Sequence, residues 1–171
     1  MTIGFSLCSM KRLYWLFFAL PFFGCSHTQL QTRICGNHPF LKSLAHSTLG
    51  TGRGDNLVYF TTHQGHKTNE YFLQVEGQHY SLRRDSLEYA SPITKQNVAA
   101  YVAALRPRLD SLNIRNYEGE PDGLGTLMVL YLKDGSTVFR TQDVASITYP
   151  GTLNNIKRAE RLCEGWYRGE Y

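Results

Sequence analysis

The stretch 126-TLMVLYLKDGSTVF-139 decides the fold. Its first part, residues 126–133, is apolar on both faces, with successive apolar residues from 127 to 132, which is typical of a central strand covered twice. Asp134-Gly135 follows directly and is the strongest short-range hairpin signal in the chain. The stretch therefore predicts an antiparallel hairpin at the centre of a sheet, with residues 136–139 in the returning strand.

Three further strands are predicted upstream of this hairpin. Residues 57–62 and 71–75 are rich in β-branched and aromatic side chains, which favour strands. Gly77 lies in a short polar turn that leads into a third strand at residues 79–82. Tight turns between successive strands imply that the three pair in antiparallel fashion.

The first main helix is expected between these strands and the central hairpin. Ser91-Pro92-Ile93-Thr94 is a helix-start signal, and apolar residues recur at helical spacing from Val98 to Leu112. Pro107 lies inside this pattern, where it removes one backbone hydrogen bond. We therefore expect the helix to kink there or to end its regular part near Leu105.

The second main helix is expected at the C-terminus. Residues 144–149 suit either a strand or a turn of helix, and Pro150-Gly151 stop that element. Thr152 can then cap a helix. The residues predicted to line one face of this helix are Ile156, Ala159, Cys163 and Trp166.

The elements together predict an α+β fold. A short helix at residues 38–46 comes first, followed by strands and helices in strand-strand-helix order. We expect an antiparallel sheet of about five strands with two main helices packed on one face. Residues 34–171 are enough for one domain that buries its own core.

The N-terminus has the parts of a secretory signal. Lys11 and Arg12 precede an uninterrupted apolar run at residues 13–23. As a helix this run would rise only about 16 Å, roughly half of the hydrocarbon core of a bilayer, so a membrane span is not expected. We predict a signal peptide over residues 1–24, with translation starting at Met1 or Met10.

The end of this leader, Phe22-Phe23-Gly24-Cys25, resembles the lipobox of bacterial lipoproteins. In that family the small residue before cysteine lets the peptidase cut, and the cysteine thiol takes the lipid. The resemblance implies that Cys25 is lipidated and becomes the first residue of the mature chain. The family prefers leucine at the Phe22 position and a small or β-branched residue at the Phe23 position. Two or more acyl chains would anchor the protein stably to a membrane.

An ordinary secretory cleavage is the alternative. Gly24 and Ser26 are small residues at the two positions that a general signal peptidase inspects, so the chain could begin at His27. Either cleavage places the domain outside the cytoplasm. The lipoprotein interpretation places it in the cell envelope on a bacterial membrane, with the outer membrane favoured and the domain in the periplasm or at the surface. Residues 25–33 are polar and aperiodic, which suits a lipidated cysteine followed by a short tether.

Two cysteines, Cys35 and Cys163, remain when Cys8 and Cys25 are assigned to the leader and the anchor. In an oxidising compartment such a pair favours a disulfide. Two free buried thiols or an intermolecular bond are the alternatives.

The charge of the chain argues against nucleic acid as a partner. The net charge is +4, and Lys11 and Arg12 of the leader contribute two of these charges. The remainder is nearly neutral and lacks the basic face that nucleic-acid binding needs. The expected partners are a membrane, through the lipid anchor, and an unknown envelope protein or glycan.

His63, His66 and His79 are the best candidates for a metal site, because imidazoles at a strand end could converge on zinc or copper. Their spacing is not specific, and histidines that flank a glycine where a strand meets a turn are usually solvated loop residues, so no metal or other cofactor is predicted. Carboxylates at Glu118, Glu120 and Asp122 resemble the start of a calcium loop, but Val129 stands where the bidentate acid belongs.

Tyrosines on strands could form a platform for sugars or a protein: Tyr59, Tyr71, Tyr80 and Tyr131.

No nucleophile in a recognisable catalytic motif is found, so no catalytic residue is assigned and the chain is not expected to be an enzyme. The favoured function is an envelope lipoprotein whose domain is a non-catalytic binding or structural module. The alternative is a secreted or periplasmic protein that binds a small ligand or a metal.

Overall fold

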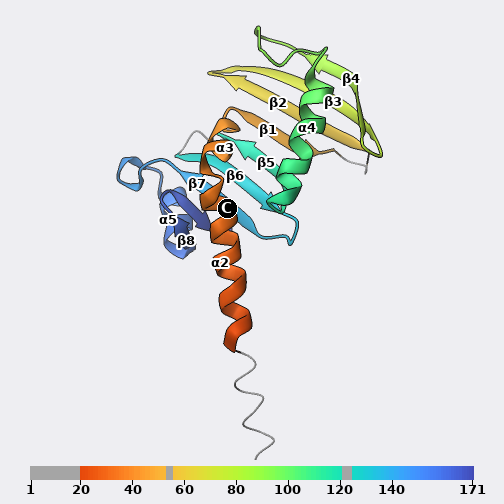
Figure 1. The fold of residues 1–171 in the computed structure, drawn as a ribbon. Coiled ribbons are helices and arrows are strands. Elements are labelled where there is room, and N and C mark those ends of the chain that lie inside the picture. Colours follow the sequence, from red (N-terminus) through yellow and green to blue (C-terminus); the bar gives the residue numbers. More distant parts are fainter. Residues whose placement is uncertain (1–19, 53–55, 121–124) are drawn as a thin grey trace, which may run out of the picture.

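One antiparallel sheet of nine strands organises the chain in the computed structural model, which describes residues 20–52, 56–120 and 125–171 (Figure 1). Side chains are described from residue 28 onward within these ranges. The order of strands across the sheet is β4-β3-β2-β1-β5-β6-β7-β9-β8.

The strands follow one another along the chain as β1 (Ser47–Thr51), β2 (Leu57–Gln64), β3 (Lys67–Glu76), β4 (His79–Ser86), β5 (Ile114–Gly119), β6 (Thr126–Leu132), β7 (Thr137–Thr141), β8 (Glu160–Cys163) and β9 (Trp166–Arg168). The helices are α2 (Leu20–Gly36), α3 (His38–Ser43), α4 (Val98–Ser111), the 3-10 helix η1 (Val144–Ser146) and α5 (Pro150–Arg158). None of the helices within the described ranges is long and apolar enough to cross a membrane.

The prediction of a five-stranded sheet with two main helices on one face is wrong. The five predicted strands are present as β2, β3, β4, β6 and β7. The sheet also contains β1, β5, β8 and β9, which are short and carry polar residues or glycine among few apolar ones. Strands of this kind are set by their neighbours in the sheet and have little signal of their own.

The predicted C-terminal helix ends early. Helix α5 stops at Arg158, and Cys163 and Trp166 pair with each other in the β8–β9 hairpin. Gly165 closes this hairpin with a φ of 73°, a conformation that suits glycine. The helical spacing of the four apolar residues therefore crosses the boundary between two different elements.

Helix α4 confirms the first predicted helix over most of its length. Its buried residues are Val98, Val102, Leu105 and Leu109. The helix begins at Val98, four residues after Thr94, and continues through Pro107 to Ser111, so the expected end near Leu105 is wrong.

Two apolar layers lie on opposite faces of the sheet. Met128, Leu130 and Leu132 of β6 join the large core that includes residues of α2, α3 and α4. Val129 of the same strand belongs to a smaller cluster with Phe139, against which α5 packs. Successive residues of a strand point to opposite faces, so β6 is covered on both sides, as its sequence predicts.

The segment expected to be an irregular tether is helical. Leu30 and Ile34 of α2 are buried in the core, and the Gln31 side chain donates a hydrogen bond of 2.7 Å to the Leu162 carbonyl. The predicted disulfide between Cys35 and Cys163 is confirmed, with the two Cα atoms 6.3 Å apart. Helix α2 is therefore fixed to β8 by packing, by a hydrogen bond and by a covalent bond.

Candidate functional site

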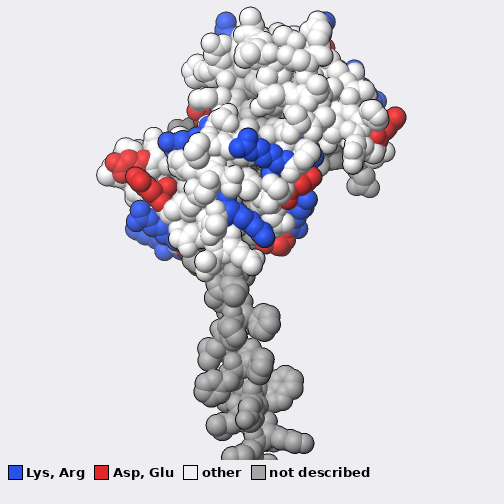
Figure 2. Space-filling view, viewed as in Figure 1, with Lys and Arg blue, Asp and Glu red and all other residues white. Residues whose placement is uncertain are grey.

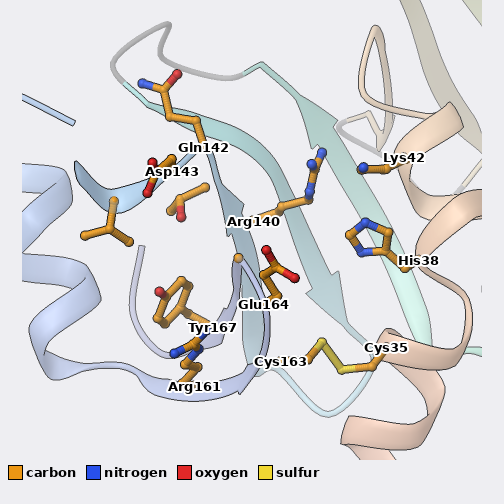
Figure 3. A pocket seen from close by; sticks show the side chains of 13 residues that line it. Cys35, His38, Lys42, Arg140, Gln142, Asp143, Arg161, Cys163, Glu164 and Tyr167 are labelled. Atoms are coloured by element: carbon orange, nitrogen blue, oxygen red, sulfur yellow. A yellow bond between two sulfur atoms is a disulfide. The ribbon is translucent and has the colours of Figure 1, made fainter. Parts of the chain in front are cut away.

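A cavity of about 710 Å³ lies beside this disulfide. Helix α3, the end of β7, the segment that follows it and the β8–β9 turn enclose it (Figure 3). Its lining residues include Cys35, His38, Lys42, Arg140, Thr141, Asp143, Arg161, Cys163, Glu164 and Tyr167. Segments far apart in the sequence thus meet here because the disulfide joins them.

Arg140 is the central cation of the cavity wall. It lies on β7 and is half-buried, and burial lowers the pKa of its guanidinium. No hydrogen bond or ion pair joins its side chain to another residue in the described ranges, although its backbone pairs with β6 and β9. By contrast, Arg106 pairs with Asp110, and Arg108 lies 3.7 Å from the centre of the Phe40 ring.

His38 is held in one orientation by a buried tryptophan. The indole Nε1–H of Trp166, which is fully buried, donates to His38 Nδ1 at 2.7 Å. Burial lowers the pKa of His38, Lys42 and Arg140 lower it further, and Glu164 opposes the shift. The neutral ring therefore accepts at Nδ1 and carries its proton on Nε2, so that it offers one further donor.

Thr141 also lines the cavity, and its hydroxyl is buried without a partner among the described residues. The residue is only 3% exposed, and its Oγ1 has no hydrogen-bond partner among the described residues. A buried hydroxyl without a partner costs free energy, so such atoms are uncommon in folded proteins.

The two acids of the lining differ in what they do. Asp143 Oδ1 accepts a hydrogen bond of 3.2 Å from the Ala145 backbone and so caps η1. Glu164 lies in the β8–β9 turn, on the far side of Arg140 from Lys42 in Figure 3. Neither acid forms an ion pair with a cation of the lining in the described part of the chain.

Charge is unevenly spread over the face of the molecule shown in Figure 2. Most of the charged side chains lie in the lower half of the domain, around α3 and α5. The upper half, over β2 and β3, is largely uncharged in this view.

The three histidines proposed for a metal do not come together. His63 lies on β2 and contacts the hydroxyls of Thr61 and Thr68 at 3.2 and 3.3 Å. His66 lies in the turn between β2 and β3, whereas His79 pairs with Glu76 at the opposite end of β3. No group of three potential metal ligands occurs among the described residues.

The acidic segment and the strand tyrosines are separated in the fold. Glu118 on β5 accepts a hydrogen bond of 3.2 Å from the Tyr131 hydroxyl, while Glu120 pairs with His46. Burial, together with Glu118, raises the pKa of Tyr131 to about 12. Asp122 lies outside the described residues.

Two of the four strand tyrosines share a surface. Tyr59 and Tyr131 flank Glu118 in a shallow hollow of about 200 Å³. Tyr71 instead lies in the core and donates to the Ile93 carbonyl at 2.6 Å, and Tyr80 packs against the same core. The four tyrosines considered as a platform therefore do not share one surface.

Residues 1–19 of the predicted leader and the side chain of Cys25 lie outside what the structure describes. The cavity residues other than the two cysteines were not predicted from the sequence. One signal was present: Arg140 interrupts an apolar strand directly after Phe139.

Comparison with protein families, with curated proteins and with solved structures finds no match to this chain.

Proposed function

We propose that the protein is an envelope lipoprotein, tethered to a bacterial membrane by lipid on Cys25, whose domain binds a ligand or partner without catalysing a reaction. The charged and apolar leader and the lipobox-like Phe22-Phe23-Gly24-Cys25 support the anchor. The disulfide fits a domain that folds outside the cytoplasm, because structural disulfides persist in oxidising compartments.

The course of α2 is the observation that carries this proposal. The helix includes Cys25 and runs without interruption to Gly36. Among its residues with described side chains, from 28 onward, Leu30 is the first that is buried, and it lies five positions after the cysteine. Five residues of helix rise only about 8 Å. In Figure 1 the N-terminal part of α2 projects from the domain. A lipid on Cys25 would therefore hold the domain close to the bilayer on a short, stiff stalk.

The cavity supports a binding role. Its volume of about 710 Å³ suits a small molecule or a protruding group of a larger one. Both cysteines in its wall are bonded to each other, so neither offers a free thiol. The wall instead presents hydrogen-bond donors and cations, which recognise a ligand without transforming it.

Metabolic labelling with an alkyne fatty acid in a bacterial host tests the anchor. We expect the full chain to be labelled and recovered with membranes, the Cys25→Ala variant to lose both properties, and the Cys8→Ala control to keep both. Equal labelling of Cys25→Ala would contradict the proposal. A mature chain that begins at His27 in mass spectrometry would instead establish the secreted alternative.

A further inference from the structure

We propose that the cavity beside the disulfide binds an anionic group, a carboxylate or a phosphate, with Arg140 as its main ligand-binding residue. This inference rests on the proposed binding role of the domain, but it does not depend on the lipid anchor.

The state of Arg140 is the first argument. A buried charge is costly unless it is paired, and arginine binds carboxylates and phosphates through two parallel hydrogen bonds. Arg140 is half-buried and has no partner among the described residues. The protein thus removes part of the water around this cation without supplying a counter-ion. Binding of an anion is favoured because it would supply one.

The neighbours of Arg140 complete an electropositive wall. His38 and Lys42 lie on α3, and their side chains face Arg140 across the cavity in Figure 3. The hydrogen bond from Trp166 at 2.7 Å occupies His38 Nδ1 and leaves the Nε2–H as a donor. One guanidinium, one ammonium and one imidazole N–H thus surround a space without an acid that pairs with them.

The other residues that line the cavity restrict the size and the charge of the ligand. The cavity is larger than a bare inorganic anion requires, and Tyr167, Val144 and the disulfide offer apolar contact area. Glu164 in the same cavity would repel a second negative charge. We therefore expect a single anionic group on an organic body, either a soluble small molecule or the phosphate headgroup of a lipid.

Tryptophan fluorescence offers a direct test. The chain has two tryptophans, Trp15 in the leader and Trp166 beside His38. In the full chain with Trp15→Phe, held in a non-ionic detergent, Trp166 is the only tryptophan. We expect saturable changes in its emission on titration with inorganic phosphate, acetate and glycerol 3-phosphate.

Variants identify the residues. Arg140→Gln should weaken binding of glycerol 3-phosphate at least tenfold, and Lys42→Gln by about twofold to fivefold. The matched control is Arg83→Gln, an exposed arginine on β4 at the other end of the sheet, which should bind as before. Thermal unfolding of each variant checks the fold, and the exposed Lys42 serves as the test residue if Arg140→Gln does not fold.

A soluble short-chain phospholipid distinguishes the two sources of the anion. Tighter binding of dihexanoyl phosphatidylglycerol than of glycerol 3-phosphate would assign the site to a lipid headgroup, and the reverse order would assign it to a soluble ligand. The absence of a saturable change with every probe, or unchanged binding by both Arg140→Gln and Lys42→Gln, would overturn the proposal. Loss of fatty-acid labelling at Cys25 would leave this result unaffected.

Discussion

Two parts of the sheet are built in different ways. In the hairpin half, formed by β2, β3, β4 and α4, neighbouring strands are also neighbours in the sequence. In the closure half, formed by α2, α3, β7, β8 and β9, the contacts join distant residues. Examples are the disulfide, with a sequence separation of 128, and the hydrogen bond from Gln31 to Leu162, with a separation of 131.

The comparison teaches where each half obtains its stability. Local pairing requires little loop closure, so the hairpin half can form from tight turns and packing alone. Joining the two ends of the chain costs more conformational entropy. The closure half meets this cost with a covalent bond, and the cavity of about 710 Å³ lies beside that bond.

The two halves also treat their buried polar groups differently. Asn69 of β3, only 1% exposed, exchanges three hydrogen bonds with the backbone of Glu88 and Tyr89. Arg140 and Thr141 in the closure half have no such partners among the described residues. The Asn69 side chain therefore serves the fold itself, whereas the Arg140 side chain is the group that we expect a ligand to meet.

Removal of the disulfide should have the largest effect. The double variant Cys35→Ser with Cys163→Ser is expected to lose about 3–5 kcal/mol of unfolding free energy, because the unfolded chain gains the entropy of a very long loop. Urea unfolding measures the loss. Hydrogen exchange should accelerate in α2, β8 and β9 more than in β2–β4. Equal acceleration in both halves would contradict the division.

Asn69→Ala should be the most damaging single change in the hairpin half. It removes three hydrogen bonds and leaves the partly buried backbone groups at Glu88 and Tyr89 without these partners, which should cost about 2–3 kcal/mol. The exposed Gln64 at the end of β2 offers a control, since Gln64→Ala should unfold at nearly the wild-type urea concentration. If Asn69→Ala increased the rate of hydrogen exchange over the wild type more in β8 and β9 than in β3, the prediction would be contradicted.

Replacement by valine should change the free energy of unfolding in opposite directions at two threonines. Thr126 is buried with an unpartnered hydroxyl, so Thr126→Val should stabilise the protein by about 1 kcal/mol. Thr62 in the hairpin half accepts a hydrogen bond of 2.7 Å from Tyr89, so Thr62→Val should destabilise it by about the same amount. Thermal unfolding compares the two variants. A stability change of the same sign in both would refute the distinction between a hydroxyl that has a hydrogen-bond partner and one that has none.

The smallest effect is expected at Asp110. Burial alone would raise the pKa of this carboxyl, but hydrogen bonds from Arg106 and Lys133, each 2.8 Å away, lower it. A lowered folded-state pKa adds stability above the unfolded pKa of 3.8, and this stability is lost as the pH falls through the folded value. Because the side chain is 39% exposed, solvent screening limits the contribution to less than about 1 kcal/mol.

The measurement is urea unfolding of the wild type and Asp110→Asn from pH 7 to pH 2. The variant should be slightly less stable at pH 7, and the difference should vanish at the acidic end. If the stability difference between the wild type and Asp110→Asn grew as the pH fell, the prediction would be contradicted.

The sequence predicts the hairpin half better than the closure half for a physical reason. Strands β2, β3 and β4 and helix α4 carry local signals, namely aromatic and β-branched runs, Gly77 in a turn, and the helical spacing from Val98. In the closure half, β9 has only three residues and β8 four. Their pairing is decided by contacts with β7 and α2, which no local pattern records.

The candidate site could likewise be predicted from the sequence only in part. The pairing of Cys35 with Cys163 follows from composition, because few cysteines are available. The cavity beside them depends on how α3 and β7 approach each other in space, so the roles of His38 and Lys42 have no sequence signature. The unusual arginine in the strand at Arg140 is the one local hint.

The separation of 128 residues between the two cysteines has a consequence for biogenesis. Ribosomes add about 5–20 residues per second, so Cys163 is made roughly 6–25 s after Cys35. Leu30 and Ile34 have no complete apolar surface to join during that interval. The disulfide therefore cannot close until almost the whole chain has been made, and a nascent chain that stalls before Cys163 keeps Cys35 without its partner thiol.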